Sequence, residues 1–118
     1  MQSFNHHQAN YHLSVPTEKG IYFFNPSEII RMEANSNYTC IYFTNRLPLV
    51  IAKILGAYEQ TLSGYGFVRT HRSHLVNKSF IRYVENTGNI LMQDASRVEI
   101  SRRKKKEVMR LLKNETLN

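Results

Sequence analysis

The sequence predicts a mainly β domain with two helices, and three observations support this prediction. Short segments rich in β-branched and aromatic residues recur along the chain and are separated by turn residues. The apolar spacing of an amphipathic helix occurs only twice. A chain of 118 residues with 42% hydrophobic content can bury one modest core, so we expect a single domain.

The first half of the chain predicts short antiparallel strands followed by a helix. Turn residues such as Asn25 and Pro26 separate the strands, which cover residues 20–24, 28–34, 38–44 and 47–51. The apolar residues that follow have helical spacing, and they are Ile51, Leu55, Tyr58 and Leu62. This spacing predicts a helix of about three turns, ended by Gly64 and Gly66.

The second half returns to strands and finishes with an amphipathic helix. We expect a hairpin turn at residues 86–89 and strands at residues 67–70, 73–76, 80–85, 89–93 and 97–100. Val108, Leu111 and Leu112 mark the apolar face of a helix over about residues 102–113.

The predicted domain covers residues 20–113, between two short extensions. We interpret residues 1–19 as an N-terminal extension or the remnant of an interdomain linker, and residues 114–118 as a C-terminal tail. Residues 1–10 are polar and rich in His and Asn, which is typical of a disordered segment or a domain boundary.

The net charge of +7 is confined to the second half of the chain. Residues 67–118 carry 12 Lys and Arg against 5 Asp and Glu, whereas residues 1–66 carry 4 of each kind. A neutral body with one basic end suits a polyanionic partner, because cationic side chains release condensed counterions when they neutralise phosphates.

Several classes of protein are disfavoured by composition. The chain has no run of about 18 apolar residues and no secretion signal, so we expect a cytoplasmic protein without a membrane partner. The single cysteine, Cys40, can form no internal disulfide or Cys-rich zinc site, and its alternation with Tyr38 and Tyr42 predicts a small core residue. We therefore expect no metal and no cofactor.

Three separated segments carry a recognisable pattern. They are EANSNYT at residues 33–39, GFVRTHRSHLVNKSFI at residues 66–81, and ISRR at residues 100–103. In this order and spacing they resemble the LytTR DNA-binding domain, the output module of LytR/AlgR-type response regulators in bacterial two-component systems. The resemblance spans roughly residues 20–112.

The resemblance implies both a fold and a function. It implies an elongated domain of several small antiparallel β-sheets with short helices, which binds direct repeats in promoter DNA and inserts loops into successive major grooves. A response regulator carries a receiver domain before such a module, so the chain is either the output domain of a longer parent chain or a free-standing one. From the lack of a heptad pattern and the net charge of one sign, we expect the isolated domain to be a monomer that pairs only on DNA.

The first expected DNA contact is the turn that ends in Asn37 and Tyr38. The resemblance makes these residues base-contacting, and an Asn amide can form paired hydrogen bonds with adenine. Asn and Ser are also ordinary turn residues, so a solvated hairpin turn is the alternative.

The second expected contact lies around Arg72. The resemblance makes Arg72 a base-reading residue, and its planar guanidinium can bond guanine O6 and N7 together. His71 and Ser73 would hold phosphate oxygens. The alternative is a strand with one exposed polar face. Asn77 is predicted to be structural, because its amide can bond the backbone and shape the following turn.

The third expected contact is the corner that begins at Ser101. Ser101 is a plausible N-cap, yet the next five residues are cationic, which opposes the positive end of the helix macrodipole. A bound phosphate would resolve this conflict. The resemblance makes Arg102 base-reading and Arg103 and Lys104 backbone partners, with Ser101 beside them. A solvated cationic helix face is the alternative.

Two other functions compete with duplex DNA binding. A nuclease could use His71 and His74, but its acidic residues are scattered singly, so we expect no enzyme. Binding of single-stranded DNA or RNA is the stronger alternative, because tyrosines on a β surface can stack bases. Most aromatic residues nevertheless alternate within strands as core residues do: Tyr22, Phe24, Tyr42, Phe43, Phe67 and Phe80.

Overall fold

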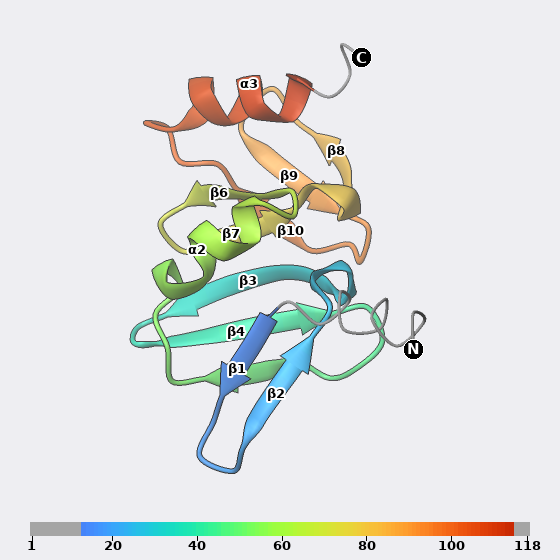
Figure 1. Ribbon diagram of the computed structural model, residues 1–118. Helices are drawn as coiled ribbons and strands as arrows, with labels where there is room; N and C mark the ends of the chain where they lie inside the picture. The colour runs from blue at the N-terminus through green and yellow to red at the C-terminus, as the bar shows by residue number, and fades with distance from the viewer. Residues whose placement is uncertain (1–12, 115–118) are drawn as a thin grey trace.

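The computed structural model describes residues 13–114, whose elements are stacked in a row from an N-terminal hairpin to a C-terminal helix (Figure 1). The strands are β1 (Leu13–Pro16), β2 (Ile21–Phe24), β3 (Ile29–Asn35), β4 (Tyr38–Phe43), β5 (Leu49–Ile51), β6 (Phe67–His71), β7 (His74–Asn77), β8 (Ile81–Val84), β9 (Asn89–Met92) and β10 (Arg97–Glu99). The helices are α2 (Gly56–Ser63) and α3 (Lys105–Asn114), with short 3-10 turns η1 (Pro26–Glu28) and η2 (Lys78–Phe80).

These strands form three antiparallel sheets. The central sheet has the order β5-β4-β3-β7-β6, the outer sheet has the order β10-β9-β8, and β1 pairs with β2 in a separate hairpin. Strand β3 lies at the centre, where Met32 faces Ile41 on β4 and Leu75 on β7. The prediction of a mainly β fold with small antiparallel sheets and two helices is confirmed.

The central sheet contributes to one core on each face, although Val50 on its edge strand β5 is 62% exposed. One face packs against the β1–β2 hairpin and α2, through a cluster that includes Val15, Leu62 and Leu75. The other face packs against the outer sheet and α3, through Val76, Ile90 and Val108 among others. Because successive side chains of a strand point to opposite faces, neighbours such as Leu75 and Val76 serve different cores.

The strand predictions agree with the structure to within two residues at either end, but the helices are shorter than predicted. Helix α2 begins at Gly56. Ile51, whose spacing predicts the first apolar residue of this helix, is instead the buried last residue of edge strand β5. Helix α3 begins at Lys105, since residues 102–104 form a turn before it.

The N-terminal boundary also differs. Residues 13–16, which the sequence predicts to belong to an extension or linker, form strand β1, and Leu13 and Val15 lie in the core. The residues 1–10 predicted to be disordered, and residues 115–118 of the predicted tail, lie outside the described residues.

Four predicted core side chains are more exposed than expected: Tyr22, Cys40, Tyr42 and Phe80. Tyr22 is 39% exposed and stacks on Phe24, with 5.5 Å between ring centroids. Cys40 is half-buried, because it lies on the face of β4 opposite the fully buried Ile41. Strict alternation identifies the two faces of a strand but does not say how completely each one is covered.

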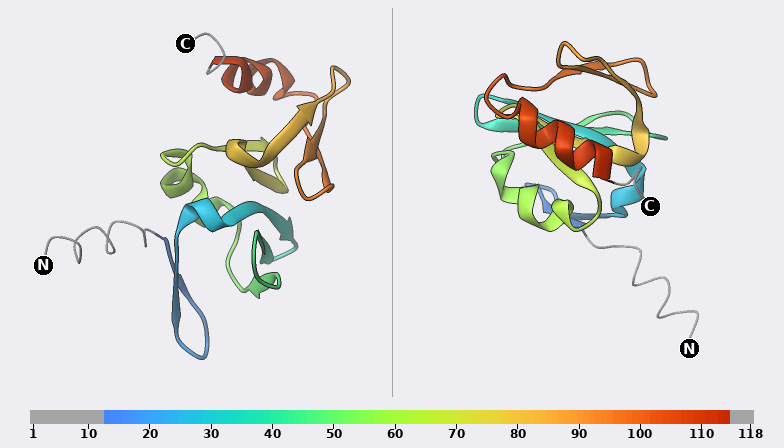
Figure 2. Two further views of the ribbon diagram at one scale, coloured as in Figure 1. Left: turned by 90° about the vertical axis from the view of Figure 1, so that its right-hand side faces the viewer. Right: turned by 90° about the horizontal axis from the view of Figure 1, so that it is seen from above.

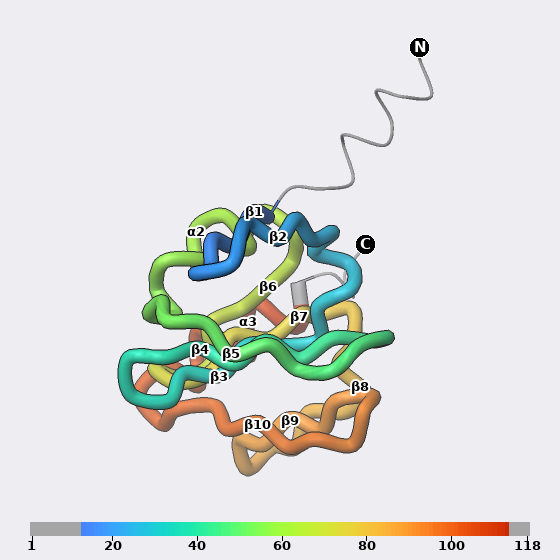
Figure 3. Tube along the Cα trace, turned by 90° about the horizontal axis from the view of Figure 1, so that it is seen from below, coloured from blue at the N-terminus to red at the C-terminus, as the bar shows by residue number. Residues whose placement is uncertain are grey.

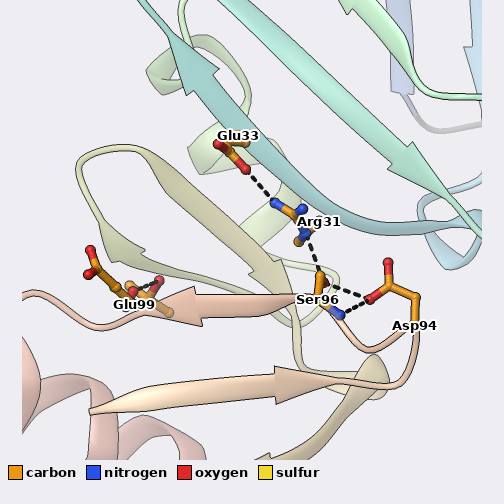
Figure 4. Close-up of polar contacts among 6 residues, drawn as sticks. Arg31, Glu33, Asp94, Ser96 and Glu99 are labelled. Atoms are coloured by element: carbon orange, nitrogen blue, oxygen red, sulfur yellow. Dashed lines mark hydrogen bonds and ion pairs between the residues drawn. The ribbon is translucent and has the colours of Figure 1, made fainter.

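A buried arginine joins the central and outer sheets. Figure 4 shows Arg31 reaching from β3 to Ser96 in the β9–β10 turn; its Nε donates to the Ser96 hydroxyl at 3.1 Å. Its Nη1 donates to Glu33 at 2.7 Å, and its guanidinium lies 4.0 Å from the Tyr42 ring centre. Burial raises the pKa of Asp94, but hydrogen bonds from the Ser96 hydroxyl and from backbone N–H groups, together with the positive charge of Arg31, lower that pKa overall.

Candidate nucleic-acid interface

Three turns lie along one edge of the molecule, on the left in Figure 1, and the views from above and below also place them together (Figures 2 and 3). They are the β3–β4 turn at residues 35–38, the β6–β7 turn at residues 71–74 and the turn at residues 101–104 before α3. We call this surface the three-turn edge. It brings together all the predicted base-contacting and phosphate-contacting residues.

Backbone hydrogen bonds fix the order of the turns. The Ala34 N–H donates to the Ser73 carbonyl at 2.9 Å, which holds the end of β3 beside the β6–β7 turn. The Ser101 N–H donates to the Thr70 carbonyl at 2.8 Å, which holds the third turn against β6. The Thr70 hydroxyl donates to the Glu99 carbonyl at 3.0 Å and reinforces this junction. The three turns are thus anchored on neighbouring, well-packed strands.

The first turn is a tight hairpin. Asn35 pairs with Tyr38, so Ser36 and Asn37 form a two-residue turn, and Ser36 has a positive φ of 59°. All four residues are exposed. The Tyr38 side chain is 53% exposed and borders a groove lined by Leu49 and Val50 of β5. The structure therefore presents the Asn37 amide and the Tyr38 ring outward.

The second turn carries Arg72 at its tip. A hydrogen bond within the turn stabilises it: Nδ1 of His71 accepts the Ser73 N–H at 3.0 Å. Nε2 of His71 is left facing outward, 3.8 Å from a Glu99 carboxylate oxygen. The Arg72 side chain is exposed, and within residues 13–114 its guanidinium makes no hydrogen bond or ion pair.

The third turn leads into α3. The Ser101 hydroxyl and carbonyl oxygens both accept the Lys104 N–H, at 3.2 and 3.1 Å. Ser101 therefore caps this turn as an N-cap caps a helix. Arg102 and Arg103 are exposed, whereas Lys104 is half-buried.

The second and third turns face one cavity of about 630 Å³. Its lining is Glu59, Arg69, His71, Arg72, Ser101, Arg102, Arg103 and Lys104. Five of these side chains are cationic and one is anionic, so the cavity favours an anion. The first turn lies outside it, further along the three-turn edge.

Comparison with known proteins identifies the fold and the family. Residues 19–113 match the family model described as the LytTr DNA-binding domain. The chain belongs to this family. The resemblance seen in its sequence is thereby confirmed, and the family's activity, DNA binding, agrees with the cationic cavity.

Two relatives extend this result. The chain is 25% identical over 112 residues to the sensory transduction protein LytT of Bacillus subtilis (strain 168). That match covers 92% of this chain and 46% of the relative, so the chain spans about half the length of the relative. A solved LytTr DNA-binding domain from Bacillus cereus has the same fold, with a TM-score of 0.71, 23% identity, and coverage of 86% of this chain and 96% of that one.

Asn77 lies in the interior of this LytTR domain and away from the three-turn edge. It is 3% exposed, and its Oδ1 accepts the Ser79 N–H at 3.0 Å. Its Nδ2 donates to the Ile29 carbonyl at 2.9 Å. These bonds join the end of β7 to the start of β3 and shape η2, which fits a structural role.

Sequence reasoning gave no role to Arg69 and Glu59, although both line the cavity. Arg69 belongs to the basic cluster of the second motif, and nothing in that cluster distinguishes an arginine that faces inward from one that faces solvent. Glu59 lies ten residues earlier, on α2, and only the fold brings it to Arg69. No sequence signal would have paired them.

His74 is the last residue of the second turn, and its side chain is half-buried. Among the described residues, its Nδ1 is buried and has no hydrogen-bond partner. Burial lowers the pKa of His74 below its ordinary value of 6.5. Glu33 and Glu99 oppose this shift, and His71 and Arg31 add to it.

This shift predicts that acid destabilises the domain through His74. The unfolded chain binds the proton at a higher pH than the folded domain does, so the contribution of His74 to stability is complete above 6.5 and is lost as pH falls through the folded pKa. Thermal melting of the wild type and of His74→Gln at several pH values measures it. We expect the melting temperature of the wild type to fall more steeply with acid; parallel curves would contradict the assignment.

Residues 13–114 contain no group of three or more His, Cys, Asp or Glu side chains arranged to hold a metal ion. In the same part of the chain, no helix has the length and apolar character needed to cross a membrane.

Proposed function

We propose that this LytTR domain binds double-stranded promoter DNA sequence-specifically and places its three turns in successive major grooves. It does so without catalysis, in the cytoplasm, as the output domain of a response regulator whose longer chain carries a receiver domain. The observation that carries the proposal is the grouping of the second and third turns around one cationic cavity, with the first turn next along the same edge.

Base contacts are assigned to exposed side chains at the turn tips. Arg72 and Arg102 each present a guanidinium that has no hydrogen bond or ion pair within residues 13–114, so its planar fork is available for guanine. Asn37 offers an amide for adenine, and Tyr38 offers an exposed ring beside it.

Phosphate contacts are assigned to the groups around these tips. Arg103 and Lys104 flank Arg102 in the cavity lining, and Ser101 can donate its hydroxyl hydrogen while its oxygen accepts from Lys104. Nε2 of His71, which also lines the cavity, and the Ser73 hydroxyl of the same turn are assigned to phosphate as well. Contacts of this kind fix the register of a protein on the duplex without reading sequence.

Competition binding tests the proposal against single-strand binding. A duplex is first selected from a random-sequence library by the wild-type domain, and unlabelled duplex, single-stranded DNA and RNA of the same sequence then compete for the protein. We expect the duplex to compete best and the selected sites to contain direct repeats about 10 base pairs apart, one helical turn. Equal or better competition by single strands would favour the alternative function.

The affinity for duplex DNA should depend strongly on salt. With about five phosphates neutralised, the logarithm of the binding constant should fall against the logarithm of salt concentration with a slope of about −4 to −5. Fluorescence anisotropy over a salt series measures this slope. A slope near zero would remove the electrostatic basis of the proposal.

The isolated domain should be a monomer in solution and should pair only on DNA. Its net charge of +7 disfavours self-association. Light scattering at micromolar concentration, with and without a duplex that contains two repeats, measures the mass. A stable dimer without DNA would contradict this prediction.

A further inference from the structure

Arg69 occupies the base of the second turn and holds the backbone of that turn. Its Nε donates to the His71 carbonyl at 3.0 Å, and its Nη2 donates to the Arg72 carbonyl at 2.5 Å. Its Nη1 donates to Oε1 of Glu59 at 2.6 Å. One guanidinium therefore binds two consecutive carbonyls of the turn and a carboxylate on α2.

The burial of Arg69 differs from that of its neighbours at the three-turn edge. The side chain of Arg69 is 17% exposed, whereas Arg72 and Arg102 are exposed on the surface. Three of its five N–H groups point to partners inside the domain. A side chain held in this way is poorly placed to follow a phosphate, although its charge borders the same cavity.

The bonds made by Arg69 complement those on the inner side of the turn. His71 accepts the Ser73 N–H, and the Ser73 carbonyl accepts the Ala34 N–H. With the carbonyls of His71 and Arg72 held by Arg69, each residue from 71 to 73 has a backbone group fixed by a partner. The backbone that carries the Arg72 side chain is thus ordered before any ligand arrives.

We propose that Arg69 is a positioning residue for Arg72, oriented by Glu59 from α2, and this inference rests on the proposed function. A turn ordered in advance loses less conformational entropy on binding, so Arg69 contributes to the affinity for a specific site without touching DNA. Helix α2, which lies outside the three sequence motifs, thereby becomes part of the recognition apparatus.

Arginine's shape is essential to this role. Lysine keeps the charge but has a single ammonium on a flexible stem, which cannot serve two carbonyls and a carboxylate in one plane. A phosphate contact does not need the planar guanidinium, because lysine also binds phosphate as a point charge. The Arg69→Lys variant therefore separates positioning from direct contact.

The experiment compares Arg69→Lys, Arg69→Gln and Glu59→Gln with the wild type. The matched control is Arg97→Gln, which removes one positive charge and the exposed pair between Arg97 and Glu85, 3.5 Å apart on the outer sheet. Each variant is titrated against the duplex selected by the wild type and against a random duplex over a salt series. Melting temperatures, and NMR amide exchange of residues 71–73 without DNA, are measured in parallel.

We expect Arg69→Lys and Arg69→Gln to lose affinity for the selected duplex alike, by about 5- to 20-fold, because ordering of the turn must then occur on binding. Their salt slopes should stay close to that of the wild type, and Glu59→Gln should show a smaller loss of the same kind. In an Arg72→Ala background, Arg69→Gln should cost little more, since it acts through Arg72. Amide exchange at residues 71–73 should be faster in both Arg69 variants and unchanged in Arg97→Gln.

Three results would overturn the inference. Full binding by Arg69→Lys together with a salt slope about one unit shallower in Arg69→Gln would make Arg69 a phosphate contact. Additive losses with Arg72→Ala would show that it does not act through Arg72. Unchanged amide exchange in the Arg69 variants would show that it does not order the turn. Failure of the wild type to select any duplex would instead refute the proposed function, and the amide exchange would still decide whether Arg69 holds the turn.

Discussion

Arg72→Lys and Arg102→Lys should each lose about 1–3 kcal/mol of affinity for the selected duplex and much less for random DNA. A bidentate contact with a guanine edge exists only in the specific complex, and lysine retains the charge but not the planar fork. Both side chains are exposed on turns whose backbones are anchored to neighbouring strands, so the substitutions should leave the fold intact.

Titration of the selected and random duplexes at one salt concentration measures the ratio of the two affinities. Lys104→Ala is the matched control, because Lys104 borders the same cavity but is assigned to phosphate. Its loss should weaken binding to both duplexes alike and make the salt slope shallower by roughly one unit. If both lysine variants keep full discrimination, Arg72 and Arg102 are electrostatic anchors and the assignment of the base-reading turns is wrong.

The strands were predictable because their signals are local. β-Branched and aromatic runs bounded by turn residues determined each strand from β2 to β10 to within two residues. Ile51 shows where local signals fail, since its spacing to Leu55 fits a helix while its pairing with Thr39 makes it part of β5. Strand β1 was missed because its buried residues, Leu13 and Val15, gain their partners only from the rest of the fold.

The candidate site was predictable where chemistry and sequence order coincide. Exposed residues such as Arg72 and Arg102 lie in motifs that the sequence displays directly, and the fold brings those motifs to one edge. The supporting contacts were not predictable. The bond between Arg69 and Glu59 joins two elements, and the orientation of His71 depends on a hydrogen bond within its own turn.

Leu75→Ala should have the largest effect on stability, a loss of about 2–5 kcal/mol. Leu75 is fully buried on β7, next to the central strand β3, and packs in the core beneath α2 and the β1–β2 hairpin. Removing its outer carbons leaves a cavity in this core. The elements around the cavity are held in place by the sheet, so they cannot move together to fill it. Val50→Ala is the matched control in the same sheet, because Val50 is 62% exposed on β5, and it should change stability by less than about 0.5 kcal/mol.

Urea unfolding followed by circular dichroism measures both variants, and NMR amide exchange compares β7 with β9. Because the central sheet supplies one face of each core, we expect the two cores to unfold together, so that Leu75→Ala lowers the protection of β9 amides as much as that of β7 amides. DNA binding below the unfolding transition should be unchanged, since Leu75 points into the core and away from the three-turn edge. Loss of β7 protection with full protection of β9 would show instead that the outer sheet and α3 form a separate cooperative unit, and the third turn would then be held independently of the first two.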